Sequence, residues 1–139
     1  MKFFTVLVIL TIAILLSCTK TGHPVEEEAA ADAATQWLAL VDSAQYEQSW
    51  NESSDIFQKA ISKSAWEQQL HSVRDPLGNL ISREVQSTQY STSLPGAPDG
   101  EYVVITFKTS FENKKAAIET VTPMKDSLGV WRVSGYYIR

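Results

Sequence analysis

Cysteine, histidine and glycine are scarce in this chain, and their scarcity excludes several kinds of chemistry. Cys18 is the only cysteine among 139 residues, so no internal disulfide can form and no thiolate nucleophile or cysteine metal site is available beyond it. The histidines are His23 and His71. The sequence contains no HExxH zinc pattern, calcium-loop pattern, glycine-rich phosphate loop or nucleophile elbow. We therefore expect neither a metal nor any other cofactor.

Basic residues are outnumbered as well. The chain carries 12 lysines and arginines against 16 acidic residues, a formal net charge of -4. A nucleic-acid-binding protein needs a basic face to displace counterions from phosphates, so the composition argues against a nucleic-acid partner. It argues equally against charge-driven binding to acidic lipids.

Only one long apolar run is present, and it lies near residue 1. Lys2 precedes an apolar stretch from Phe3 to Leu16, and the small residue Ser17 then stands before Cys18. A membrane-spanning helix needs roughly 20 apolar residues, so this stretch is short for a span and typical of a secretory signal. An uncleaved single-span anchor is the alternative. In both cases the bulk of the chain is predicted to lie outside the cytoplasm.

The closing run Leu15-Leu16-Ser17-Cys18 resembles a bacterial lipobox, with Leu16 a less usual residue at its position. The resemblance implies cleavage between Ser17 and Cys18 and a diacylglyceryl group on the Cys18 sulfur. Two or more acyl chains anchor stably, because each buried methylene contributes about 0.8 kcal/mol. Thr19, a residue other than Asp, implies delivery to the outer membrane in enteric-type bacteria. We therefore expect a lipoprotein of the bacterial cell envelope that is anchored to the outer membrane and faces the periplasm.

This interpretation divides the chain into three parts: a signal peptide over residues 1–17, a lipidated tether over 18–24 and one domain over 25–139. Removing 17 of the 139 residues leaves 122, which suits a single domain with its own core. The signal contains one basic residue, Lys2, so 11 basic and 16 acidic residues remain and the charge becomes -5.

Helix signals come first in this domain and strand signals follow. Apolar spacing of three and four predicts helices over residues 25–44 and 46–61, and a capping box at Ser64 and Glu67 predicts a third that ends near Asp75. Alternating patterns then predict four strands, over residues 81–89, 103–111, 117–125 and 130–139. The first strand is polar and suits a sheet edge, whereas the second is apolar on one face and suits the centre. Short connections make the neighbours antiparallel. The predicted fold class is α+β, with three N-terminal helices packed on a curved antiparallel sheet of about four strands.

A set of residues spread over almost the whole domain carries a family resemblance: Ala34, Trp37 and Leu38, Tyr46, Ser49 and Trp50, Trp66, Arg74, Pro76–Gly78, Leu94–Gly96, Pro98–Tyr102, Phe111, Glu119–Val121 and Trp131–Arg139. Together they resemble a bacterial family of small secreted proteins, domain-of-unknown-function family 4019 (DUF4019). The resemblance implies no activity and no site residues, because none is assigned in that family. The element order also looks like the nuclear-transport-factor-2-like or cystatin-like architecture, in which sheet and helices often enclose a cavity for ligands, catalysis or dimer formation.

Three residues are candidates for a pocket: His71, Arg74 and Arg132. His71 has Glu67 and Asp75 one turn to either side, a row that could orient an imidazole as a general base. A solvated row of paired charges on an exposed helix explains the same spacing.

The arginines also leave two interpretations open. Pairing of Arg74, Arg83, Arg132 and Arg139 with Glu84, Glu101 or Glu119 across the sheet is one interpretation, and a convergent arginine pocket for a carboxylate or phosphate is the other. The four tryptophans and the tyrosines at 46, 102, 136 and 137 are predicted to be mostly core, with the mouth of a ligand cavity as the alternative.

The sequence favours a non-enzymatic binding or structural module, tethered to a membrane and contacting an envelope protein or small ligand. The alternative is a small acid-base enzyme that uses His71, or a small-ligand-binding protein. The two functions differ in whether the His71 face lines a concave pocket or faces solvent. A purely structural dimeric module would need an exposed apolar sheet face, which the polar residues Ser82, Glu84, Gln86 and Thr88 disfavour.

Overall fold

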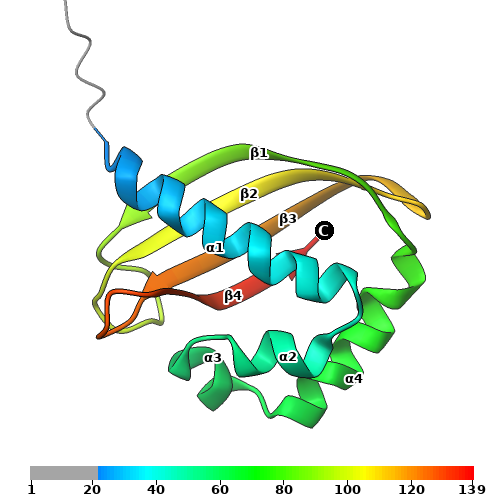
Figure 1. The fold of residues 1–139 in the computed structure, drawn as a ribbon, viewed down its shortest axis with the longest axis horizontal. Coiled ribbons are helices and arrows are strands. Elements are labelled where there is room, and N and C mark those ends of the chain that lie inside the picture. The colour runs from blue at the N-terminus through cyan, green and yellow to red at the C-terminus, as the bar shows by residue number, and fades with distance from the viewer. Residues whose placement is uncertain (1–21) are drawn as a thin grey trace, which may run out of the picture.

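The fold combines helices with one antiparallel sheet, as Figure 1 shows for a computed structural model that describes residues 22–139. The helical elements are α1 (Pro24–Asp42), α2 (Tyr46–Asn51), α3 (Asp55–Ala60), α4 (Lys63–Val73) and a 3₁₀ turn, η1 (Asp75–Leu77). The strands are β1 (Leu80–Ser91), β2 (Tyr102–Phe111), β3 (Lys114–Lys125) and β4 (Trp131–Ile138). The predicted α+β class is confirmed. The predicted signal peptide, Ser17 and Cys18 lie outside the described residues.

The four strands form one sheet in the order β1-β2-β3-β4, and every neighbouring pair is antiparallel. The prediction that residues 103–111 form a central strand is confirmed, because β2 pairs with β1 on one side and β3 on the other. Val103, Ile105, Phe107 and Phe111 of β2 are buried on the face that meets the helices. The polar β1 is an edge strand, as its sequence predicts.

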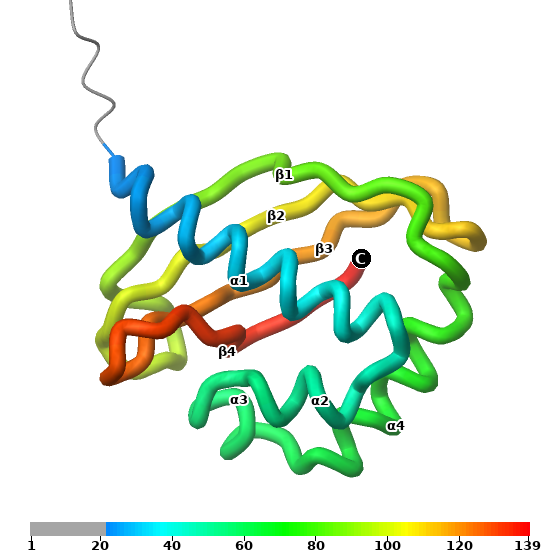
Figure 2. Tube along the Cα trace, viewed as in Figure 1, coloured from blue at the N-terminus to red at the C-terminus, as the bar shows by residue number. Residues whose placement is uncertain are grey.

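Helix α1 lies across the inner face of the sheet and contacts all four strands (Figure 2). Its buried stripe is Ala30, Ala34, Trp37, Leu38 and Val41, in which the two alanines allow a close approach to the strands. No helix among residues 22–139 combines the length and the apolar character needed to cross a bilayer.

The predicted helix over residues 46–61 is wrong in its extent, because the chain breaks into α2 and α3 at Ser53 and Ser54. Ser54 has extended backbone, its Oγ accepts a hydrogen bond from the amide of Phe57 at 3.3 Å, and it thereby caps α3. The Ser54 amide donates to the carbonyl of Val133 in β4 at 2.9 Å. The break therefore fastens the helices to the edge of the sheet, and the domain has four α-helices in place of the predicted three.

The start of α4 also differs from the prediction. Ser62, and not Ser64, caps this helix, and its Oγ accepts from the amide of Ala65 at 3.2 Å. The helix ends at Val73, ahead of the proline in η1. Gly78 then turns the chain into β1 with a φ of 74°, a conformation that favours glycine.

Strand β1 carries a bulge that the predicted alternation misses. Arg83 lies opposite Thr109, but the register shifts between Val85 and Ser87, so that Thr88 and not Ser87 lies opposite Ile105. The prediction of one continuous face from residue 81 to 89 is therefore wrong beyond Val85, because the extra residue reverses the alternation.

An aromatic cluster fills the space between the helices and the sheet. The Trp37 ring lies 5.2 Å from that of Tyr136 and 5.9 Å from that of Trp66, and Trp66 packs edge-on against Phe57 at 4.9 Å. The Trp37 Nε1 donates to the Ser49 carbonyl at 2.8 Å. The prediction that most large rings belong to the core is thus confirmed for these residues. Tyr137, which is 60% exposed, is an exception.

Candidate functional site

Charged residues enter the core beside this aromatic cluster. The buried carboxylate of Glu119 in β3, 0% exposed, accepts hydrogen bonds from three donors. Its Oε1 accepts from Arg83 Nε and from Thr109 Oγ1, both at 2.7 Å, and its Oε2 accepts from the hydroxyl of Tyr136. β1, β2, β3 and β4 each supply one of these four residues. A carboxylate buried in this way needs such donors, because burial removes its water.

Asp42, the last residue of α1, extends the network toward η1. Arg83 Nη1 and Nη2 donate to its two carboxylate oxygens at 2.6 and 3.0 Å, a two-pronged arrangement that suits the planar guanidinium. Arg74 Nη2 donates to Asp42 Oδ1 at 3.2 Å, and Arg74 Nη1 donates to the Gly78 carbonyl at 2.6 Å. We call Asp42, Arg74, Arg83, Thr109, Glu119 and Tyr136 the buried ionic network.

The buried ionic network shifts the pKa values of Tyr136 and Arg83. Burial first, and then the negative charge of Glu119, raise the pKa of Tyr136 far above its ordinary value, so its hydroxyl stays a donor. Burial opposes the charged form of Arg83, but its hydrogen bonds to Asp42 and Glu119 outweigh burial and raise its pKa. Two cations and two carboxylates therefore neutralise one another, which suits a structural role better than proton transfer.

Among the arginine–glutamate pairs that the sequence left open, Arg83 with Glu119 is present, whereas Arg74 and Arg132 have partners that the sequence did not predict. Arg74 pairs with Asp42 of α1, and Arg132 pairs with Asp126, whose Oδ2 lies 3.0 Å from Arg132 Nε. Arg74 and Arg83 do converge, but on a carboxylate of this chain. Arg132 lies at the start of β4, apart from that network.

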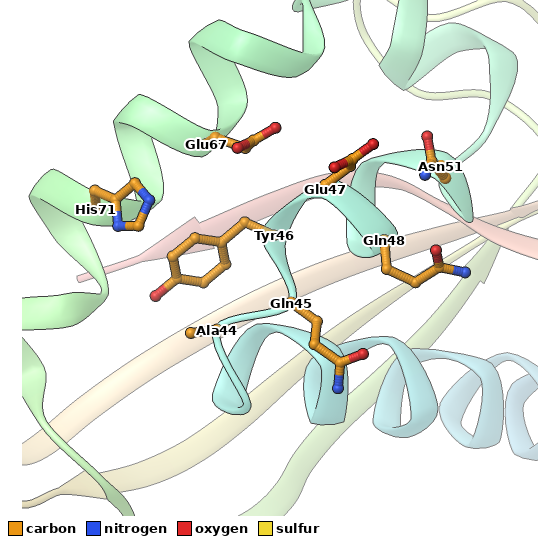
Figure 3. Close-up of a pocket in the computed structure, with 8 residues that line it drawn as sticks. All are labelled: Ala44, Gln45, Tyr46, Glu47, Gln48, Asn51, Glu67 and His71. Carbon is orange, nitrogen blue, oxygen red and sulfur yellow. The ribbon is translucent and has the colours of Figure 1, made fainter.

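His71 lies elsewhere, beside a surface groove between α2 and α4 (Figure 3). This His71 groove has a volume of about 480 Å³ and is lined by Ala44, Gln45, Tyr46, Glu47, Gln48, Asn51, Glu67 and His71. The imidazole is 61% exposed. Asp75 holds the imidazole, with Oδ2 2.7 Å from His71 Nδ1, while Glu67 lines the groove one turn away. His71 therefore faces mainly solvent at the rim of an open groove.

A row of hydrogen bonds orients the imidazole. The Tyr46 hydroxyl donates to Asp75 Oδ1, and the Tyr46 ring packs edge-on against His71 with centroids 5.1 Å apart. An ionised carboxylate only accepts, so His71 Nδ1 carries a proton and Nε2 is the basic atom of the neutral ring.

The same row makes a testable prediction about Asp75. The hydrogen bond from Tyr46, followed by that from His71, lowers the pKa of Asp75 below its ordinary 3.8. Stability contributed by this carboxylate is present above pH 3.8 and is lost as the pH falls through its lower folded-state pKa. Carbon-13 NMR titration should show Asp75 titrating below 3.8 in the wild type. Tyr46→Phe should move its pKa upward.

Tyr102→Phe is the matched control, because that hydroxyl donates to the Pro98 carbonyl at the other end of the sheet. It should leave the pKa of Asp75 unchanged. A wild-type Asp75 that titrates at or above 3.8, or a Tyr46→Phe protein with no shift, would contradict the described hydrogen bonding.

A metal site requires a cluster of metal-ligating side chains. Within residues 22–139, no three side chains of histidine, cysteine, aspartate or glutamate are grouped so that they could hold an ion.

The family to which the chain belongs follows from its match to a family model. Residues 33–136 match the sequence model of a family described as a protein of unknown function, DUF4019. The chain belongs to the DUF4019 family. The match runs from the middle of α1 to Tyr136, so it includes the buried ionic network and the His71 groove of this DUF4019 domain. The resemblance found from the sequence motifs is confirmed. No curated protein shows significant similarity to the chain.

Proposed function

We propose that this DUF4019 protein is a non-enzymatic lipoprotein of the bacterial envelope whose domain binds a partner while it stays tethered through Cys18. The observation that supports a non-enzymatic function is that the buried charged groups of the domain are paired with one another. Asp42, Arg74, Arg83 and Glu119 neutralise one another, and Tyr136 is held as a donor to Glu119. Apart from the buried Arg74 Nε, which has no hydrogen-bond partner among the described residues, the donors and acceptors of these groups bond within the protein. Binding at the surface is therefore the function that we favour.

We also propose that the architecture is nuclear-transport-factor-2-like, with the cavity between sheet and helices filled. Support comes from α1 lying across the sheet and from the rings of Trp37, Trp66 and Tyr136 packed where a ligand would sit. A filled cavity leaves the outer surface for recognition. The partner is then an envelope protein or a small ligand that docks on that surface.

Attachment through Cys18 would place the domain close to its membrane. The His23 ring stacks on that of Tyr90 with centroids 3.8 Å apart, so the chain is fastened to the domain from residue 23. Four residues separate Cys18 from His23, so the five steps along the chain between them reach at most about 18 Å. Partners within the same membrane, or close to its surface, are therefore favoured over distant ones.

Cross-linking in intact cells of the host, followed by mass spectrometry, tests the proposal. The wild-type protein should capture one reproducible envelope partner, and Cys18→Ala should lose it, because the untethered domain is diluted away from the membrane. Cys18→Ala is compared at equal amount and with an unchanged melting temperature, so that loss of capture reports loss of tethering. Absence of any reproducible partner, or equal capture by both proteins, would contradict a tethered binding module.

A second function rests on the hydrogen bond between Asp75 and His71. An imidazole oriented by a carboxylate beside a groove is the minimum for acid-base catalysis, and the groove could hold a small polar substrate. In a host that lacks the protein, this enzyme hypothesis predicts that His71→Gln fails to restore function while partner capture persists. The binding hypothesis predicts that His71→Gln restores function fully.

A further inference from the structure

The end of the sheet next to the proposed anchor carries features that the binding function leaves unexplained. In this antiparallel order, the β1–β2 loop and the β3–β4 turn lie at the same end. The start of α1 joins them there, because His23 stacks on Tyr90 at the end of β1 (Figure 2). The hydroxyl of Tyr90 donates to Glu101 at 3.0 Å, and Glu101 pairs with Lys125 at the end of β3, at 3.7 Å. We call this the anchor end.

Two loops with exposed apolar residues project from the anchor end. The β3–β4 turn carries Leu128 at its tip, 84% exposed, followed by Val130, which is 44% exposed. The β1–β2 loop contains no charged residue from Thr92 to Pro98 and includes the exposed Pro95, although the exposed Asp99 follows directly. Val25 at the start of α1 is 75% exposed. Among the seven large hydrophobic side chains that are exposed in the described chain, three thus lie at this end.

The charged side chains at the β3–β4 turn bond within the protein. Asp126 Oδ1 accepts from the amides of Leu128 and Val130, both at 2.9 Å, and Asp126 Oδ2 accepts from Arg132 at 3.0 Å. Those bonds hold the turn in one shape with Leu128 at its apex. Leu128 therefore points outward from a turn that hydrogen bonds hold in place, and its side chain makes few contacts within the protein.

We propose that the anchor end rests on the lipid headgroup layer, with Leu128 and the loop from Thr92 to Pro98 entering it. The proposal rests on the proposed anchoring at Cys18, since a chain of about 18 Å holds this end against the bilayer. Apolar side chains and uncharged loop tips suit the interfacial region. The net negative charge of the protein selects a neutral lipid surface over an anionic one.

A fluorescent probe on the turn tests this contact. The full-length lipidated protein is inserted into vesicles of phosphatidylethanolamine and phosphatidylcholine that contain nitroxide-labelled lipids. Leu128→Cys carries an environment-sensitive fluorophore, and no other thiol reacts, because the acylated Cys18 is the only other cysteine. We expect a blue shift and strong quenching. Asn113→Cys, in the β2–β3 turn at the opposite end of the sheet, is the matched control and should show neither effect.

The outcomes separate the two proposals. Flotation of the protein with the vesicles reports anchoring, and quenching at position 128 reports the contact. Flotation without quenching, or equal quenching at positions 113 and 128, would overturn the contact and leave the anchor in place. Failure to float would overturn both. With the fluorophore on Val130→Cys, the additional change Leu128→Asp should abolish quenching, and persistent quenching would also contradict the proposal.

Discussion

Replacing Glu119 by alanine is expected to lower the free energy of unfolding by about 3 to 5 kcal/mol, which urea denaturation followed by circular dichroism measures. The reason is that the buried Glu119 carboxylate is the hydrogen-bond acceptor for three side chains in the core. Without it, the Arg83 guanidinium, 10% exposed as a side chain, keeps Asp42 but loses the anion on its Nε side. The hydroxyls of Thr109 and Tyr136 lose their acceptor at the same time.

Two comparisons show whether the loss comes from the buried charge. Glu84→Ala, on an exposed position of β1, should change stability by less than about 0.5 kcal/mol. Glu119→Leu combined with Arg83→Met removes both charges and should be less destabilising than Glu119→Ala alone, because no unpaired charge remains in the core. A loss below about 1 kcal/mol for Glu119→Ala would show that the buried ionic network contributes little.

Trp37→Ala is the second change with a large expected effect, again about 3 to 5 kcal/mol in the free energy of unfolding. The Trp37 ring is buried against Trp66, Phe57 and Tyr136. Its truncation therefore leaves a cavity that the surrounding packed side chains cannot fill by relaxing. The loss also removes a donor from the Ser49 carbonyl, which accepts from Trp37 Nε1 at 2.8 Å. Thermal and urea unfolding should agree on the change.

The matched control for this ring is Tyr137→Ala on the exposed face of β4. This change should lower the free energy of unfolding by well under about 1.5 kcal/mol, because the exposed Tyr137 buries little area. If the two substitutions cost the same, the cluster around Trp37 would not be the centre of the core.

Much of the fold follows from local patterns in the sequence. Alternation in β2 places Val103, Ile105 and Phe107 on one face, and the apolar spacing of α1 places Trp37 and Val41 on one side of the helix. Both patterns lead to a helix across a central strand, because each apolar face must be buried against another. The family resemblance was likewise visible in the sequence motifs.

The errors lie where side chains override local patterns. Ser53 and Ser54 compete with the backbone and divide a helix that the apolar spacing alone would continue. The bulge near Val85 adds a residue that no periodic pattern indicates. Both features depend on contacts with a distant element, such as the bond from the Ser54 amide to Val133.

The buried ionic network was only partly predictable. Glu119 lies between Ala117 and Val121 on the apolar face of a predicted strand, and a carboxylate at such a position signals a buried cationic partner. The sequence offered Arg83 as one of four arginines that could be that partner and did not single it out. Asp42 and Tyr136 carry no comparable signal, because their place in the network depends on how α1 and β4 meet in the fold. Of the three candidates from the sequence, Arg74 belongs to the buried ionic network, Arg132 lies apart from it, and His71 faces mainly solvent.

Mass spectrometry of the intact protein, extracted from the membranes of its host, tests the tethered module most directly. The account predicts a chain that begins at Cys18, with residues 1–17 removed and the mass of a diacylglyceryl group and further acylation on that residue. A chain that still begins at Met1, or one whose Cys18 is an unmodified thiol, would contradict it.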